Sequence, residues 1–153
     1  ISDLGLLALF EQQGYNAKHV VITGGEPCMY DLRGLTELLH ERGFTSQIET
    51  SGTFEVKCAQ QTWVTVSPKV NMKGGYDVLT SALQRANEIK HPIAMQKHVD
   101  ELDALLAGID LTDKVVCLQP ISQQARATEL AIKTCIDRNW RLSLQTHKYV
   151  GIA

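Results

Sequence analysis

The sequence lacks an excess of charge of one sign and lacks any long apolar run, and each absence excludes a class of protein. Fifteen Lys and Arg residues against seventeen Asp and Glu residues give a formal net charge of −2, so no overall positive field attracts nucleic acid or an anionic membrane. No apolar stretch approaches the roughly 20 residues that span a bilayer, and nothing resembles a secretory signal. We therefore expect a cytoplasmic protein without nucleic-acid or membrane partners.

Cysteines are few, and their spacing excludes the common local cysteine motifs. No two of the four cysteines form a Cys-x-x-Cys pair, which argues against a zinc ribbon or a local redox motif; they are Cys28, Cys58, Cys117 and Cys135. Cys117 lies in an apolar run and Cys135 in a helical pattern, so we expect buried, reduced thiols. Cys28 follows a glycine-rich segment, but one cysteine there cannot hold an iron–sulfur cluster. No metal ligand is predicted in this chain.

The length and composition predict one globular domain. With 153 residues, 44% apolar and 21% charged, the chain can bury a substantial core, and it shows no clear repeat or low-complexity segment. It begins at Ile1 without a methionine, and its first pattern is a helix with Ser2 or Asp3 as N-cap. We therefore expect residues 1–153 to form a single α/β domain that is incomplete at its N-terminus.

Helical and strand patterns alternate along the chain, which predicts an α/β fold with a parallel sheet and right-handed helical crossovers. The pattern predicts helices over 3–13, 32–43, 77–90, 99–107 and 122–138, and strands over 19–23, 45–50, 63–66, 93–97, 114–119 and 141–146. In the helix expected over 77–90, Leu79, Leu83, Ala86 and Ile89 share one face and Pro92 ends the pattern.

The carboxyl ends of the predicted strands are rich in polar and small residues. Ligands of open α/β sheets and of βα barrels bind at these ends. Each end taken alone is also ordinary turn chemistry, but five together favour a polar ligand site. The ends are Thr23-Gly24-Gly25-Glu26-Pro27, Glu49-Thr50-Ser51-Gly52-Thr53, Ser67-Pro68-Lys69, Gln119-Pro120 and Gln145-Thr146-His147-Lys148.

The Thr23–Pro27 segment suits a ligand with an ammonium group. Gly24 and Gly25 let backbone N–H groups approach a ligand without a Cβ, and Glu26 adds a carboxylate. A phosphate cradle is disfavoured, because Glu26 would face the phosphate and no P-loop lysine follows.

The other strand ends offer complementary groups. Glu49 either accepts from ribose hydroxyls or fixes a neighbouring loop. Ser67 and Lys69 flank Pro68 and suit a carboxylate, although a lone lysine is often merely solvated. Gln119 offers its amide to a heterocycle edge or is an ordinary strand-end residue. An ammonium site, a carboxylate site and ribose acceptors together describe S-adenosylmethionine.

These strand-end motifs, together with the ending Gln145-Thr146-His147-Lys148-Tyr149, resemble the 7-carboxy-7-deazaguanine synthase family of radical S-adenosylmethionine enzymes. The resemblance extends over nearly all 153 residues and is strongest to the enterobacterial type. It implies a partial (β/α) barrel, here without its first strand, and a homodimer.

The resemblance also implies roles for residues. S-adenosylmethionine would be bound by Gly24, Gly25, Glu26, Ser67, Pro68, Lys69, Gln119 and Pro120, with Glu49 and Ser51 as further candidates. The pterin substrate would contact Thr23, Gln145, His147 and the terminal carboxylate of Ala153. The implied reaction is a radical ring contraction of 6-carboxy-5,6,7,8-tetrahydropterin to 7-carboxy-7-deazaguanine in queuosine biosynthesis. It uses S-adenosylmethionine, Mg²⁺, a [4Fe-4S] cluster and an external electron donor.

The sequence departs from the family pattern in one respect. The family holds its cluster with three cysteines on a loop after the first strand, and none of the four cysteines here aligns with that loop. We therefore expect the cluster and Mg²⁺ ligands to lie outside this chain, no catalytic residue within it, and no radical reaction by the chain alone. Two alternatives are a nucleoside-binding α/β module and a regulatory protein, both without redox chemistry.

Overall fold

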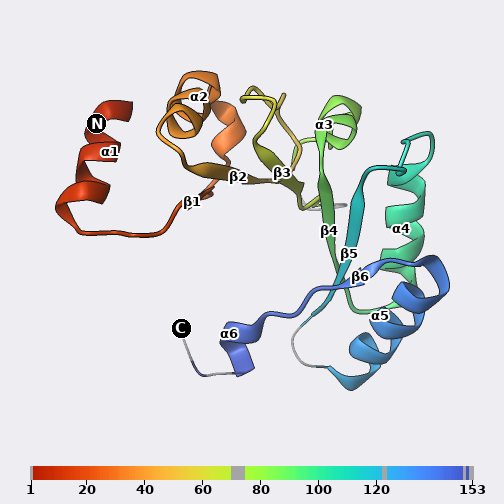
Figure 1. Ribbon diagram of the computed structural model, residues 1–153. Helices are drawn as coiled ribbons and strands as arrows, with labels where there is room; N and C mark the ends of the chain where they lie inside the picture. The colour runs from red at the N-terminus through yellow and green to blue at the C-terminus, as the bar shows by residue number, and fades with distance from the viewer. Residues whose placement is uncertain (1, 70–74, 122–123, 150, 152–153) are drawn as a thin grey trace.

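A curved, open sheet of six parallel strands organises the molecule (Figure 1). The computed structural model describes residues 2–69, 75–121, 124–149 and 151. The strands follow one another in chain order: β1 (His19–Ile22), β2 (Thr45–Thr50), β3 (Trp63–Val66), β4 (Glu88–Ile93), β5 (Val115–Pro120) and β6 (Arg141–Leu142). Strictly sequential parallel strands place every carboxyl end at one edge of the sheet. The predicted α/β class with a parallel sheet is confirmed.

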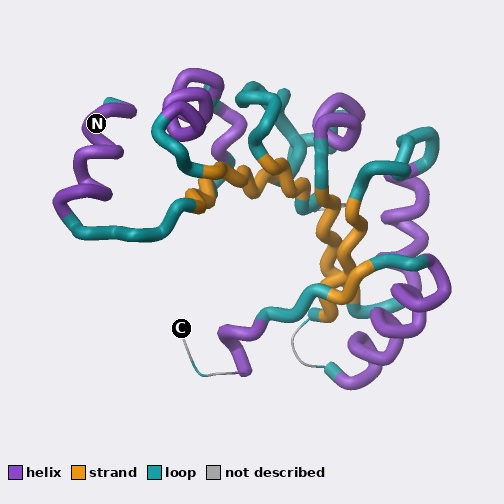
Figure 2. Tube along the Cα trace, viewed as in Figure 1, coloured by secondary structure: helices purple, strands orange, loops and turns teal. Residues whose placement is uncertain are grey.

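Most of the helices cover one face of the sheet (Figure 1). They are α1 (Asp3–Gln12), the 3₁₀ helix η1 (Pro27–Met29), α2 (Arg33–Glu41), α3 (Thr80–Arg85), α4 (Gln96–Leu106), α5 (Ala125–Arg138) and α6 (Thr146–Tyr149). Helices α2 to α5 line the outer, convex face, whereas α6 lies on the side of the concave face (Figure 2). The arrangement is that of part of a βα barrel, in which the concave face lines the interior.

The core lies between the convex face and the helices. Burial in β2 alternates, with Ile48 fully buried and Gln47 and Glu49 on the opposite, concave face. The main cluster is formed by Val64, Val66, Leu83, Ala86, Ile89, Ile93, Val99, Leu102, Leu106, Val116, Leu118, Ala131 and Cys135. This alternation leaves polar side chains facing the barrel interior, where the site is expected.

The helix predicted over 77–90 forms only in part, and the strand predicted over 93–97 lies earlier in the chain. The helix ends at Arg85, and residues 88–93 form β4. Leu83, Ala86 and Ile89 are all buried as the helical spacing suggested, but Leu83 lies in α3, Ala86 caps it and Ile89 lies in β4. Asn87 starts the new strand, since its N–H donates to the Val64 carbonyl and its side chain accepts from the Val64 N–H, both at 2.9 Å. The period-2 burial of β4 therefore overrides the helical spacing.

Pro92 lies within β4 without breaking the sheet. The Ile93 carbonyl accepts a hydrogen bond from the Ile121 N–H at 2.9 Å, so odd-numbered residues of β4 direct their backbone toward β5. Pro92 faces the β3 side, where pairing extends only to Ile89. Its missing N–H therefore removes no bond from the sheet, which is why proline is tolerated.

The C-terminal region also differs from the prediction. The strand expected over 141–146 contains only Arg141 and Leu142, and Thr146 begins α6. Because β6 pairs only with β5, an edge strand here ends where pairing ends. In α5 the buried face is made of small side chains, including Ala127 and Ala131, whereas Ile136 is 75% exposed.

No helix within the described residues is both long and apolar enough to cross a membrane.

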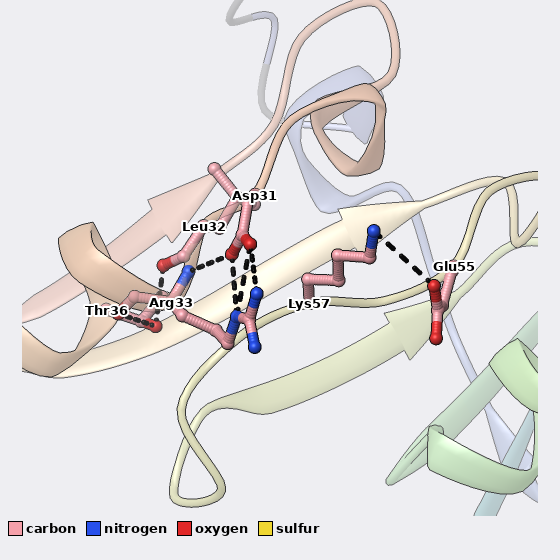
Figure 3. Close-up of polar contacts among 6 residues, drawn as sticks. All are labelled: Asp31, Leu32, Arg33, Thr36, Glu55 and Lys57. Atoms are coloured by element: carbon pink, nitrogen blue, oxygen red, sulfur yellow. Dashed lines mark hydrogen bonds and ion pairs between the residues drawn. The ribbon is translucent and has the colours of Figure 1, made fainter.

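The N-terminus of α2 is held by local polar contacts, which Figure 3 shows. Asp31 accepts from the Arg33 N–H at 3.1 Å and pairs with its guanidinium, and the side-chain hydrogen bond from Arg33 lowers the pKa of Asp31 to about 2. Thr36 is fully buried; its hydroxyl donates to the Leu32 carbonyl at 2.8 Å and accepts from the Ala59 N–H at 2.8 Å. Thr36 thus joins α2 to the segment before β3.

We predict that Thr36→Val destabilises the fold by about 1–2 kcal/mol, because the isosteric side chain leaves the buried Ala59 N–H without an acceptor. Urea unfolding measures the change. Thr128→Val is the matched control, since Thr128 also bonds to a carbonyl four residues earlier, but this hydrogen bond is exposed to solvent. Equal stability of the two variants would contradict this role of Thr36.

Candidate functional site

The predicted strand-end motifs meet at the carboxyl edge of the sheet. Thr23 directly follows β1, and Glu49 is the second-last residue of β2. Ser67 follows β3, and Gln119 and Pro120 are the last two residues of β5. The Ser67 N–H donates to the Thr50 carbonyl at 2.7 Å, so the β2 and β3 ends are joined directly. The fold therefore gathers side chains that are up to about a hundred positions apart in the sequence.

The Gly24–Gly25 segment is open. Gly24 has φ +135°, a conformation that residues with a side chain rarely adopt, and both glycines are exposed. No atom lies within 4 Å of the point where a Cβ would stand on either residue. The segment thus leaves backbone and space accessible to a ligand; ligand binding there stays a prediction.

The Glu26 carboxylate is saturated with hydrogen bonds from the protein itself. One oxygen accepts from the Cys28 N–H at 3.1 Å and from the Thr50 hydroxyl. The other accepts from the Ser51 N–H at 2.8 Å and from the Ser51 hydroxyl. A carboxylate has about four acceptor positions. In this arrangement Glu26 therefore joins the β1 loop to the end of β2, a structural role that the sequence did not predict.

The pKa of Glu26 reflects this arrangement. Burial alone raises it, but the hydrogen bonds from Ser51, Thr50 and Cys28 together outweigh burial and lower the pKa below the ordinary value. Glu26 is consequently ionised near neutral pH, and its negative charge lies at the strand ends.

A chain of polar contacts crosses four strands on the concave face. The His19 ring lies 2.8 Å from the Thr45 hydroxyl and 3.3 Å from the Gln47 side-chain oxygen. The Gln47 amide donates to Glu49 at 2.8 Å, and the Lys90 ammonium donates to the other Glu49 oxygen at 2.9 Å. The ion pair is half-buried, with side-chain exposures of 24% for Glu49 and 26% for Lys90.

Further charges lie next to this ion pair. Burial raises the pKa of Glu88 and the nearby Glu49 adds to the effect, whereas Lys90 and Arg141 oppose it. Burial, and after it the charge of Glu88, raises the pKa of Cys117 to about 11. The concave face around the Glu49–Lys90 ion pair is therefore a charged, partly dehydrated surface that favours a polar ligand.

A buried histidine lies near the Ser67-Pro68-Lys69 segment. Ser67 is half-buried, Pro68 is buried and Lys69 is exposed. His91 is 4% exposed and interacts with the backbone of Pro68 and His98. Burial, and after it the neighbouring His98, lowers the pKa of His91 in spite of those backbone contacts. The lowered pKa favours the neutral imidazole, and its buried Nδ1 has no hydrogen-bond partner among the described residues.

The C-terminal candidates are only partly described. Gln145 is half-buried in the segment between β6 and α6, so it does not close a strand as predicted. The backbone of His147 lies in α6, and Ala153 lies outside the described residues.

The sequence analysis missed Gln47, Lys90 and Glu88 of this surface. For Glu88 and Lys90 the signal is the period of two in 88–93, which the predicted helix over 77–90 concealed; Gln47 shares a face with Glu49 in the correctly predicted strand 45–50. Once residues 88–93 are recognised as a strand, Lys90 shares a face with Glu88, away from Ile89 and His91.

The cysteines do not form a metal site. All four are free, and Cys28, Cys117 and Cys135 are buried, as predicted for the last two. Burial raises the pKa of Cys28 to about 11, whereas metal ligation needs thiolates. Within the described part of the chain, no group of three His, Cys, Asp or Glu side chains is placed to hold a metal ion. These residues therefore do not fit an iron–sulfur cluster, whereas the open, polar strand ends fit S-adenosylmethionine.

Comparisons with known proteins agree with this geometry. The chain is 62% identical over 99% of its length to 7-carboxy-7-deazaguanine synthase of Escherichia coli K12 and covers 69% of that protein. It is 43% identical to the enzyme of the same name from Buchnera aphidicola, over 96% of the chain and 66% of the relative.

The chain belongs to the 7-carboxy-7-deazaguanine synthase family. The predicted family is confirmed, and with it the expectation that the chain is part of an enzyme. The crystal structure of QueE from Escherichia coli superposes with a TM-score of 0.91 at 60% identity, covering 95% of this chain and 64% of that one. No protein-family model matches the chain. The chain thus spans about two thirds of the length of its 7-carboxy-7-deazaguanine synthase relatives.

Proposed function

We propose that the protein containing this chain is a 7-carboxy-7-deazaguanine synthase of queuosine biosynthesis. In the proposed reaction, 6-carboxy-5,6,7,8-tetrahydropterin undergoes an S-adenosylmethionine- and Mg²⁺-dependent radical ring contraction to 7-carboxy-7-deazaguanine. The observation that carries the proposal is the 62% identity over 99% of the chain to the Escherichia coli enzyme of that name. The meeting of the strand-end motifs at one edge supports it.

The role proposed for this chain is to bind and shield the cofactor, which supplies the radical chemistry when bound. Exposed backbone at Gly24 and Gly25 receives the methionine amino end, beside the charge of Glu26. Ser67 and Lys69, stiffened by Pro68, receive the carboxylate.

The adenosine half of the cofactor is assigned to the neighbouring strand ends. Gln119 and Pro120 line the adenine. Glu49 and Ser51 are proposed to accept from the ribose hydroxyls. Glu49 suits this role because it accepts two hydrogen bonds within the described residues and so retains acceptor capacity, which Glu26 does not.

The pterin is assigned to Thr23 at the β1 end and to the C-terminal segment with Gln145, His147 and the carboxylate of Ala153. Ligands for the [4Fe-4S] cluster and for Mg²⁺ are assigned to the part of the protein that this chain does not span. An external electron donor, a homodimer and a cytoplasmic location complete the proposal.

An anaerobic assay of the complete gene product tests the function. The expected result is formation of 7-carboxy-7-deazaguanine from the carboxylated tetrahydropterin, dependent on S-adenosylmethionine, together with an iron content of about four per chain. An intact mass equal to residues 1–153 alone, or preparations without iron, would overturn it. Calorimetry with S-adenosylmethionine addresses the binding-module alternative, since full affinity of the 153-residue chain alone favours that alternative.

We predict that Lys69→Ala weakens binding of S-adenosylmethionine about two- to fivefold, the effect expected for loss of one exposed ion pair. Calorimetric titration of the complete protein measures it. Lys97→Ala is the control, since Lys97 is also an exposed lysine but lies in α4. Equal affinities for both variants would remove Lys69 from the carboxylate site.

A further inference from the structure

The Glu49 carboxylate is held by a neighbour on its own strand, Gln47, and by Lys90, which lies two strands away in the sheet. The Gln47 amide reaches one oxygen at 2.8 Å, and the Lys90 ammonium reaches the other at 2.9 Å from β4, across β3. The same Gln47 amide lies 3.3 Å from the Thr65 hydroxyl of β3, so the contacts continue through the intervening strand. Three strands thus fix the orientation of one carboxylate.

The arrangement differs from that of Glu26 in what remains free. Glu26 accepts four hydrogen bonds from the protein, so its acceptor positions are filled. Glu49 accepts two within the described residues, which leaves about two positions for a ligand. Of the two carboxylates, Glu49 is therefore the one that the fold has both oriented and left available.

Lys90 is the charged group that holds the Glu49 carboxylate in its orientation. Its ammonium donates to Glu49 at 2.9 Å, and the ion pair is half-buried, so it holds the carboxylate more firmly than an exposed pair would. A freely rotating carboxylate would lose conformational freedom on binding, whereas a fixed one does not. A lysine that orients the acceptor therefore strengthens ligand binding without touching the ligand.

We propose that Lys90 is a positioning residue, which with Gln47 holds the Glu49 carboxylate as an acceptor for hydroxyl or N–H donors of the bound ligand. The inference rests on the proposed function, which supplies two sources of such donors: the ribose diol of S-adenosylmethionine and the N–H groups of the pterin. Lys90 acts through Glu49 in either case.

Calorimetric titrations of the complete protein with S-adenosylmethionine, and separately with the pterin, test the inference. Lys90→Met raises the Kd about tenfold for the ligand that Glu49 contacts, and Lys90→Arg restores most of the affinity. Lys97→Met is the matched control, because Lys97 is also ion-paired but exposed. Gln47→Met removes the other donor to Glu49, so it weakens binding of the same ligand. It serves as the second variant if Lys90→Met does not fold.

A double-mutant cycle separates positioning from a general structural effect. In a Glu49→Gln background, Lys90→Met changes the Kd less than twofold, because its target is already lost. The inference is overturned if the fold-increases in Kd of the two single variants multiply in the double variant. It is also overturned if folded Lys90→Met binds both ligands with unchanged affinity. Failure of the wild-type protein to bind either ligand instead overturns the proposed function.

Discussion

Gly52→Ala will destabilise the protein by roughly 2–5 kcal/mol. Gly52 has φ +77°, which costs an alanine about 1–2 kcal/mol. An added Cβ would also lie 2.7 Å from Val66 Cγ1 and 3.2 Å from Val78 Cγ1, and overpacking of this kind costs about 1–3 kcal/mol. Both costs arise because the loop after β2 passes directly over the β3 end and α3.

Urea unfolding of Gly52→Ala and Gly43→Ala separates the two contributions. Gly43 has φ +78°, but no atom lies within 4 Å of its Cβ position, so only the backbone cost remains. The difference between the two variants measures the steric contact. Indistinguishable midpoints would mean that Val66 and Val78 move away at little cost.

Glu26→Gln is the second change with a large expected effect, about 1–3 kcal/mol of lost stability. The amide replaces an acceptor oxygen by a donor, which opposes either the Cys28 or the Ser51 N–H. Because the same carboxylate joins the β1 loop to the β2 end, we also expect weaker binding of S-adenosylmethionine. Glu55→Gln is the control, since Glu55 is exposed and forms a surface ion pair with Lys57 at 3.5 Å.

The Glu26 effect depends on pH with a definite sign. Because the folded-state pKa lies below the unfolded value near 4.5, the ionised carboxylate stabilises the fold fully above that value. This stabilisation is lost as the pH falls through the folded-state pKa. Unfolding curves of wild type and Glu26→Gln measured down this range will therefore converge. A constant difference between the two proteins at all pH values would show that Glu26 does not contribute as an anion.

Elements with strong local signals were predictable from the sequence. The β2 residues 45–50 and the β3 residues 63–66 were predicted with the bounds that the structure shows. Helix α2 was predicted over 32–43 and spans Arg33–Glu41, ending before Gly43 as that residue implied. Local chemistry decides these elements, because a glycine in the left-handed conformation ends a helix whatever surrounds it.

Elements whose identity depends on pairing were predicted wrongly. Residues 88–93 carry Ile89 and Pro92, which fit a helix face and its end equally well. They form a strand because β3 and β5 supply hydrogen-bonding partners on either side, and because Pro92 falls where no partner is needed. The information for this choice lies in other strands, so a local pattern cannot contain it.

By itself, the sequence determined the α/β class, the family and the strand-end motifs of the candidate site. These follow from periodicity and from contiguous residues such as Gly24-Gly25-Glu26. Only the tertiary structure decided how the carboxylates differ. Glu26 is saturated by Ser51 and its neighbours, whereas Glu49 is held by Lys90 and retains acceptor capacity. Hydrogen bonding over 25 to 41 positions makes that distinction, and such contacts exist only once parallel strands bring distant residues to one face.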